Sequence, residues 1–114
     1  MKKIETSLDG AFIIEPQVFG DVRGWFYESY SKQKMHDIGI DVEFVQDNRS
    51  FSAQQGTLRG LHCQTPPMAQ TKLLTCLRGK ILDVAVDIRR GSPTYMQWTA
   101  VELSGENKKM FFIP

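Results

Sequence analysis

The sequence has little of what marks membrane, secreted or metal-binding proteins. It contains two cysteines and two histidines in 114 residues. It has no run of about 18 apolar residues, the length that a membrane-spanning helix requires, and its first residues lack the apolar stretch of a signal peptide. We therefore expect no membrane association and a cytoplasmic location, where Cys63 and Cys76 stay free thiols.

An excess of charge of one sign is also missing. Fourteen basic and thirteen acidic residues give a formal net charge of +1, so no nucleic-acid partner is expected and any recognition of a charged ligand must be local. The chain lacks a glycine-rich phosphate loop and a nucleophile elbow. His62 is followed by Cys63 and Gln64 rather than by a second histidine, so no metal site is expected.

The chain does contain many short segments rich in β-branched and aromatic residues, separated by turn residues. One helix is expected over residues 31–39, capped by Ser29 or Ser31 and ended by Gly39. The pattern predicts an all-β antiparallel sandwich or barrel with one short helix, formed as a single domain over residues 1–114. The expected strands are residues 11–14, 25–30, 42–51, 57–64, 71–77, 81–88, 97–103 and 110–113.

The most informative segment is residues 56–64, which reads as a buried strand carrying His62 beside Gly60. An imidazole has an ordinary pKa near 6.5 and can accept a proton at physiological pH. Arg59 is suited to grip phosphate oxygens, and Lys72 is suited to stabilise negative charge on a substrate oxygen. Strict alternation puts Arg59 and His62 on opposite faces, so a shared pocket requires a bulge at Gly60 or a place at the strand's edge.

Two carboxylates share one face of the segment 81–88. Asp83 and Asp87 flank Ala85 in an otherwise apolar run, and a carboxylate in such a place must be paired. Asp83 is therefore a candidate pocket carboxylate that pairs with Lys72 or orients His62. A purely structural ion pair explains it equally well.

Motifs along nearly the whole chain resemble those of one known family. They are FGDVRGWFYES at 19–29, FVQDN at 44–48, LRGLHCQ at 58–64, AQTKL at 69–73 and DVAVDIR at 83–89. In order and spacing they are similar to the dTDP-4-dehydrorhamnose 3,5-epimerases. The resemblance implies a cupin-type jelly-roll β-sandwich or barrel, a homodimer with an exchanged arm, and no metal or organic cofactor.

The resemblance also implies a reaction and a set of roles. The substrate would be a dTDP-linked 4-keto-6-deoxy sugar of dTDP-L-rhamnose biosynthesis, whose C4 ketone acidifies the protons at C3 and C5. His62 matches the general base that removes these protons, and Lys72 would stabilise the enolate. The substrate-binding matches are Arg59 for the phosphates, Arg23, Phe26 and Glu28 for the nucleotide, with Arg23 and Glu28 reaching across from the partner subunit, and the run Gln46, Asp47 and Asn48.

The chain departs from the family's pattern at its end. Beyond Pro114 the family continues with a Gly-Phe-Ala-His-Gly-Phe-like segment, a proton-donating tyrosine and an aspartate paired with the base. The resemblance thus implies a domain incomplete at its C-terminus and leaves the activity of these 114 residues alone open. Two alternatives remain at this stage: a single-carbon epimerase or 3,4-ketoisomerase on nucleotide sugars, and a non-catalytic nucleotide-sugar-binding fragment.

Overall fold

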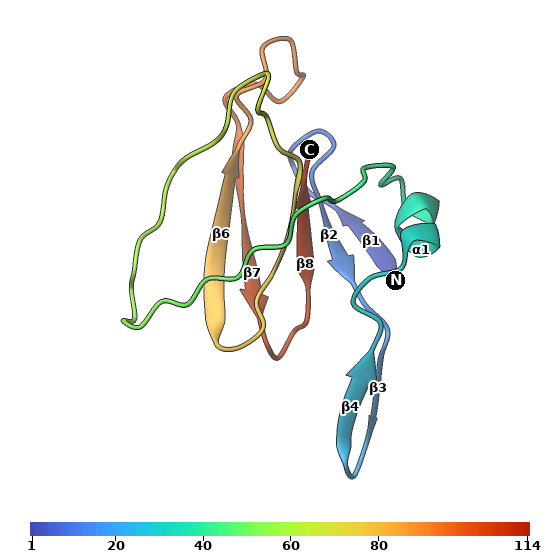
Figure 1. Cartoon of the computed structure of the whole chain (residues 1–114). Helices are drawn as coiled ribbons and strands as arrows, with labels where there is room; N and C mark the ends of the chain where they lie inside the picture. Colours follow the sequence, from blue (N-terminus) through green and yellow to red (C-terminus); the bar gives the residue numbers. More distant parts are fainter.

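The computed structural model describes residues 1–114 and consists mainly of short antiparallel strands (Figure 1). They form a four-stranded sheet in the order β1-β2-β8-β5 and two hairpins, β3–β4 and β6–β7. No helix is long and apolar enough to cross a membrane. The elements are β1 (Lys2–Glu5), β2 (Phe12–Glu15), β3 (Val18–Asp21), β4 (Gly24–Tyr27), α1 (Lys32–Asp37), β5 (Lys72–Thr75), β6 (Lys80–Val86), β7 (Trp98–Ser104) and β8 (Met110–Ile113).

The hydrophobic core lies on both faces of β8. Because side chains alternate along a strand, Phe111 points into a cluster with Val101 and Leu103 of β7. Met110 and Phe112 point the other way, into a cluster that includes residues of β2 and α1. The continuous apolar run of β8 is therefore explained by burial on both sides.

Helix α1 forms as the sequence predicts, with Ser31 rather than Ser29 as its N-cap. The Ser31 hydroxyl accepts a hydrogen bond from the Lys34 backbone N–H at 3.4 Å. Gly39, at φ +93°, ends the helix, and the Ile40 N–H donates to the Met35 carbonyl at 2.9 Å in a Schellman arrangement. Met35 is 1% exposed and anchors the helix to the core.

The hairpin β3–β4, which we call the arm (residues 18–27), stands away from the rest of the molecule (Figure 1). Its strands pair only with each other. The turn of the arm is confined to Val22 and Arg23. The Asp21 carboxylate accepts the Arg23 N–H at 2.8 Å and so closes the chain over these two residues.

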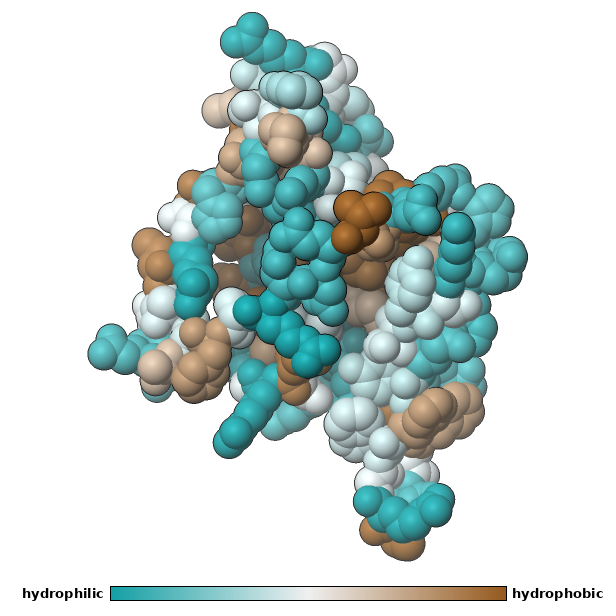
Figure 2. All heavy atoms as spheres, viewed as in Figure 1, coloured by the Kyte–Doolittle hydropathy of each residue, from teal (hydrophilic) through white to brown (hydrophobic).

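Two predicted strands are absent. Residues 42–51 and 57–64 have no strand, and across 42–71 the one backbone–backbone hydrogen bond joins the Met68 N–H to the Thr65 carbonyl. Strand propensity is expressed only beside a partner strand, and this segment runs as a long loop without one (Figure 1). Most of its apolar side chains, among them Val45, Phe51 and Leu58, are exposed, whereas Phe44 packs against the core cluster that includes Met35 of α1. Figure 2 shows hydrophobic patches, in brown, on one face of the molecule.

A buried carboxylate ties the loops at one end of the β6–β7 hairpin together. Asp87 accepts hydrogen bonds from the Arg89 guanidinium at 2.8 and 2.9 Å, and from the hydroxyls of Ser92 and Thr94 at 2.5 and 2.7 Å. These donors, the Arg89 guanidinium above all, hold the pKa of Asp87 well below its usual range. Arg89 also donates to the Asp9 carbonyl at 2.6 Å, which links this loop to the β1–β2 connection.

Replacing Asp87 by Asn is expected to lower the free energy of unfolding by about 3 kcal/mol at pH 7, because donors are left facing an amide. We place the effect at the low end of the range for a broken buried pair, since the Arg89 side chain is 43% exposed. Urea unfolding measures it. The stabilisation that ionised Asp87 gives the folded state is complete above the unfolded-state pKa near 3.9 and is lost as the pH falls below it. The difference in free energy of unfolding between wild type and Asp87→Asn should therefore shrink below about pH 4.

The exposed Asp37→Asn variant is the matched control, because that carboxylate accepts a single surface hydrogen bond from Gln33. It should shift the urea midpoint very little. An Asp87→Asn protein as stable as wild type at pH 7 would contradict the structural role of the cluster.

Candidate active site

His62 lies exposed in the long loop, not in a buried strand as the sequence predicted. Gly60, at φ +100°, turns the chain back so that a Cβ added there would lie 3.1 Å from His62 Nδ1. The absence of a side chain at Gly60 therefore lets the imidazole fold over the backbone.

Lys72, at the start of β5, connects the main sheet to the His62 segment. Its ammonium donates to the amide oxygens of Gln64 at 3.2 Å and Gln70 at 3.1 Å, and Gln64 donates to Gln70 at 3.0 Å. Gln64 lies two residues from His62 in the same loop. The motifs predicted neither Gln64 nor Gln70 as a site residue, because their contacts with Lys72 depend on tertiary structure.

Arg59 does not join that group. Its guanidinium donates to the Ser52 hydroxyl at 3.2 Å and the Phe51 carbonyl at 3.1 Å, bracing one part of the long loop against another. The run Gln46–Asn48 is exposed as well, and Gln46 donates to Asn48 at 3.0 Å. Asp47 is exposed beside them.

Asp83 has neither of the partners considered for it. It lies on the inner face of the β6–β7 hairpin, opposite the buried Val101, and makes no hydrogen bond or ion pair with Lys72, His62 or any other side chain. Burial raises the pKa of its carboxyl. The expectation that it must be paired is wrong, because the group is only partly buried and keeps some access to water.

A second group of expected site residues gathers at the base of the arm. Phe26 and Glu28 line a hollow of ≈210 Å³, and the Glu28 carboxylate pairs with Lys34 of α1 at 2.9 Å. Arg23 lies apart from this hollow at the tip of the arm, where Asp21 holds its guanidinium at 2.5 Å. The other residues that line the hollow are Met1, Gln17, Phe19 and Lys34.

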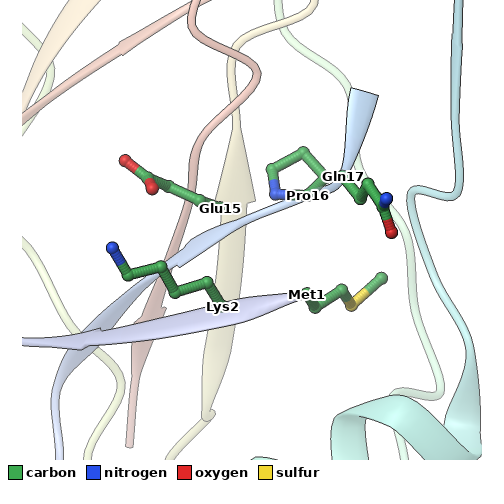
Figure 3. A pocket seen from close by; sticks show the side chains of 5 residues that line it. All are labelled: Met1, Lys2, Glu15, Pro16 and Gln17. Atoms are coloured by element: carbon green, nitrogen blue, oxygen red, sulfur yellow. The ribbon is translucent and has the colours of Figure 1, made fainter. Parts of the chain in front are cut away.

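A neighbouring hollow of ≈330 Å³ shares Met1 and Gln17 with the first (Figure 3). Its one titratable acid, Glu15, is paired with Lys109 at 3.2 Å. Neither hollow is lined by His62, Arg59 or Lys72. No three side chains of His, Cys, Asp or Glu lie close enough together to hold a metal ion.

Apart from Asp83, the expected site residues thus fall into an arm group and a loop group. A family profile described as dTDP-4-dehydrorhamnose 3,5-epimerase matches residues 5–114. The chain belongs to this family. A dTDP-4-dehydrorhamnose 3,5-epimerase from Methanothermobacter thermautotrophicus is 53% identical over 97% of this chain and 59% of its own length.

Solved structures of family members agree over almost all of the chain. The epimerase from Bacillus anthracis, with TDP and PPi bound, has a TM-score of 0.96 and 49% identity over 99% of this chain and 65% of its own. A dTDP-6-deoxy-D-glucose-3,5-epimerase from Legionella pneumophila, in complex with dTDP-4-keto-L-rhamnose, has a TM-score of 0.92 and 53% identity over 99% and 60%.

These matches confirm the predicted fold class, an all-β cupin-like β-sandwich with one short helix. The chain spans about three fifths of the length of these epimerases.

Replacing Asp83 by Asn is expected to leave the urea midpoint at pH 7 unchanged or to raise it. The folded-state pKa of Asp83 lies above its unfolded value, so ionisation favours the unfolded chain once the pH rises through the folded pKa. Any gain in stability of Asp83→Asn over wild type should therefore disappear near pH 3. Glu102→Gln, on the opposite face of the hairpin, serves as the control; a clear loss of stability in Asp83→Asn would mean that the carboxylate has a partner.

Proposed function

We propose that this chain acts as a dTDP-4-dehydrorhamnose 3,5-epimerase. It removes and returns the protons at C3 and C5 of a dTDP-linked 4-keto-6-deoxy sugar without a cofactor. The main support is the likeness to the Legionella pneumophila epimerase, whose structure holds dTDP-4-keto-L-rhamnose. A cytoplasmic location and a single domain over residues 1–114 belong to the same proposal.

In the proposed reaction His62 is the general base and Lys72 stabilises the enolate oxygen. The Lys72–Gln64 hydrogen bond supports this assignment, because it brings an ammonium to the segment that carries the imidazole. A neutral imidazole can take a proton next to a ketone, and a nearby cation lowers the energy of the resulting enolate. Arg59 would exchange its loop contacts for the substrate's phosphates.

The arm would complete the site of a neighbouring subunit. Arg23 and Phe26 lie on a hairpin that stands off the body, and Glu28 lies directly after it. Phe26 is 71% exposed and lies beside Phe19 across the hairpin, which suits a base-stacking surface. Reciprocal insertion of two arms gives a closed homodimer, in which the run 46–48 also contacts substrate.

The reaction is tested by incubating the purified protein with dTDP-4-keto-6-deoxy-D-glucose in deuterated water and reading the product by NMR. We expect deuterium at both C3 and C5. His62→Ala should slow the exchange by about 10²–10⁴-fold, the usual contribution of a general base, and should leave TDP affinity close to wild type.

His36→Ala is the matched control, because His36 lies on α1 and contacts Asp41 instead; its exchange rate should be unchanged. Label at one carbon alone would indicate a single-site epimerase. TDP binding without any exchange would indicate a binding fragment, and exchange retained by His62→Ala would remove His62 from the base role.

If the arm of each subunit completes the site of the other subunit, the variants His62→Ala and Arg23→Ala should complement each other. In a mixed dimer, the intact arm of a His62→Ala chain serves the intact His62 of an Arg23→Ala chain. Equal mixing after unfolding and refolding should therefore restore about a quarter of wild-type turnover, because half the dimers are mixed and each has one complete site. If the arm serves its own chain, mixing restores nothing.

A further inference from the structure

Lys108, in the turn between β7 and β8, is a buried cation without an acidic partner. The residue is 9% exposed, and its ammonium donates to the carbonyls of Gly105 at 3.2 Å and Glu106 at 3.1 Å. No carboxylate lies within ion-pair distance of it. The ammonium lies 4.3 Å from the centroid of the Trp25 ring in the arm.

This position is costly for a lysine in two ways. Burial of an ammonium without a counter-charge is unfavourable, and Lys108 has φ +55°, a backbone region that favours glycine or asparagine. The next residue, Lys109, makes an ordinary ion pair with Glu15. A lysine at 108 supplies two things that the smaller turn residues do not. Its ammonium donates to the Gly105 and Glu106 carbonyls within the turn, and it contacts the Trp25 ring, which lies outside the turn.

Lys108 contacts the face of the arm that is opposite to Phe26. Trp25 and Phe26 are consecutive in β4 and point to opposite faces. Trp25 packs on Tyr27, with ring centroids 5.4 Å apart, while Phe26 faces the hollow that Glu28 also lines. Lys108 therefore touches none of the residues expected to meet the nucleotide.

We propose that Lys108 is a positioning residue: by holding Trp25 it fixes the angle at which the arm leaves the body and presents Phe26 and Arg23 to the nucleotide. Since β3 and β4 pair only with each other, the arm's direction depends on side-chain contacts of this kind. The effect on nucleotide binding rests on the function proposed above, whereas the contact between Lys108 and Trp25 is independent of that function.

The test uses Trp98→Phe as the parent, so that Trp25 is the one tryptophan left. Lys108→Met keeps an unbranched chain but removes the charge, Lys108→Arg keeps a cation, and Lys109→Met is the control. We expect Lys108→Met to shift Trp25 emission, to increase its quenching by acrylamide, and to weaken TDP binding by roughly three- to tenfold, as loss of a cation–π contact implies. Lys108→Arg and Lys109→Met should resemble the parent.

A second variant leaves the turn untouched and guards against misfolding of Lys108→Met. Trp25→Leu should weaken TDP binding by a similar factor, and the double variant should lose no more than either single one, because both remove the same contact. Unchanged Trp25 emission and quenching in Lys108→Met would overturn the tie. Altered emission with unchanged TDP affinity would overturn the positioning role.

A parent protein that binds no TDP would instead overturn the proposed function. The Trp25 emission and quenching would still decide whether Lys108 holds the arm.

Discussion

Burial of β8 on both faces is the constraint on which the other elements depend. Phe112 stacks on Phe12 of β2 with ring centroids 4.8 Å apart, while Phe111, fully buried, packs against the β6–β7 hairpin. Burying such aromatic side chains contributes roughly 1.5–3 kcal/mol each. One strand of four residues thus joins the helix side of the molecule to the second hairpin.

That strand also sets the place of Lys72, one of the residues proposed to act in the reaction. Lys72 pairs with Ile113 of β8, so the register of β5 on β8 fixes where the ammonium enters the His62 segment. Side-chain hydrogen bonds among Lys72, Gln64 and Gln70 then join β5 to the loop that carries His62. Each such bond contributes only about 0.5–1.5 kcal/mol net, so the His62 loop is far less firmly held than the sheet that presents it.

The sequence predicted the parts of the fold that depend on neighbouring residues. The Ser31 cap, the Gly39 stop and the strands 81–88, 97–103 and 110–113 agree with the structure within a few residues. The strand predicted over 57–64 is absent because a strand needs a partner, and nothing in its own residues says whether one is present. The motifs predict the candidate site residues, but the separation of these residues into two groups depends on tertiary structure that no motif encodes.

Asp83 and Asp87 show why equal sequence signals can have opposite outcomes. Asp83 lies in β6 and Asp87 directly follows it, in the same two-residue period of the sequence. Asp87 receives donors from Arg89, Ser92 and Thr94 on the following loop, whereas Asp83 faces the buried Val101. The donors of Asp87 are within seven residues and belong to one turn, so a local motif suffices to satisfy it. A donor for Asp83 would have to come from a distant part of the fold. An unpaired, partly buried carboxylate on the inner face of the hairpin is therefore available to a cationic group that approaches that face, which its fully satisfied neighbour is not.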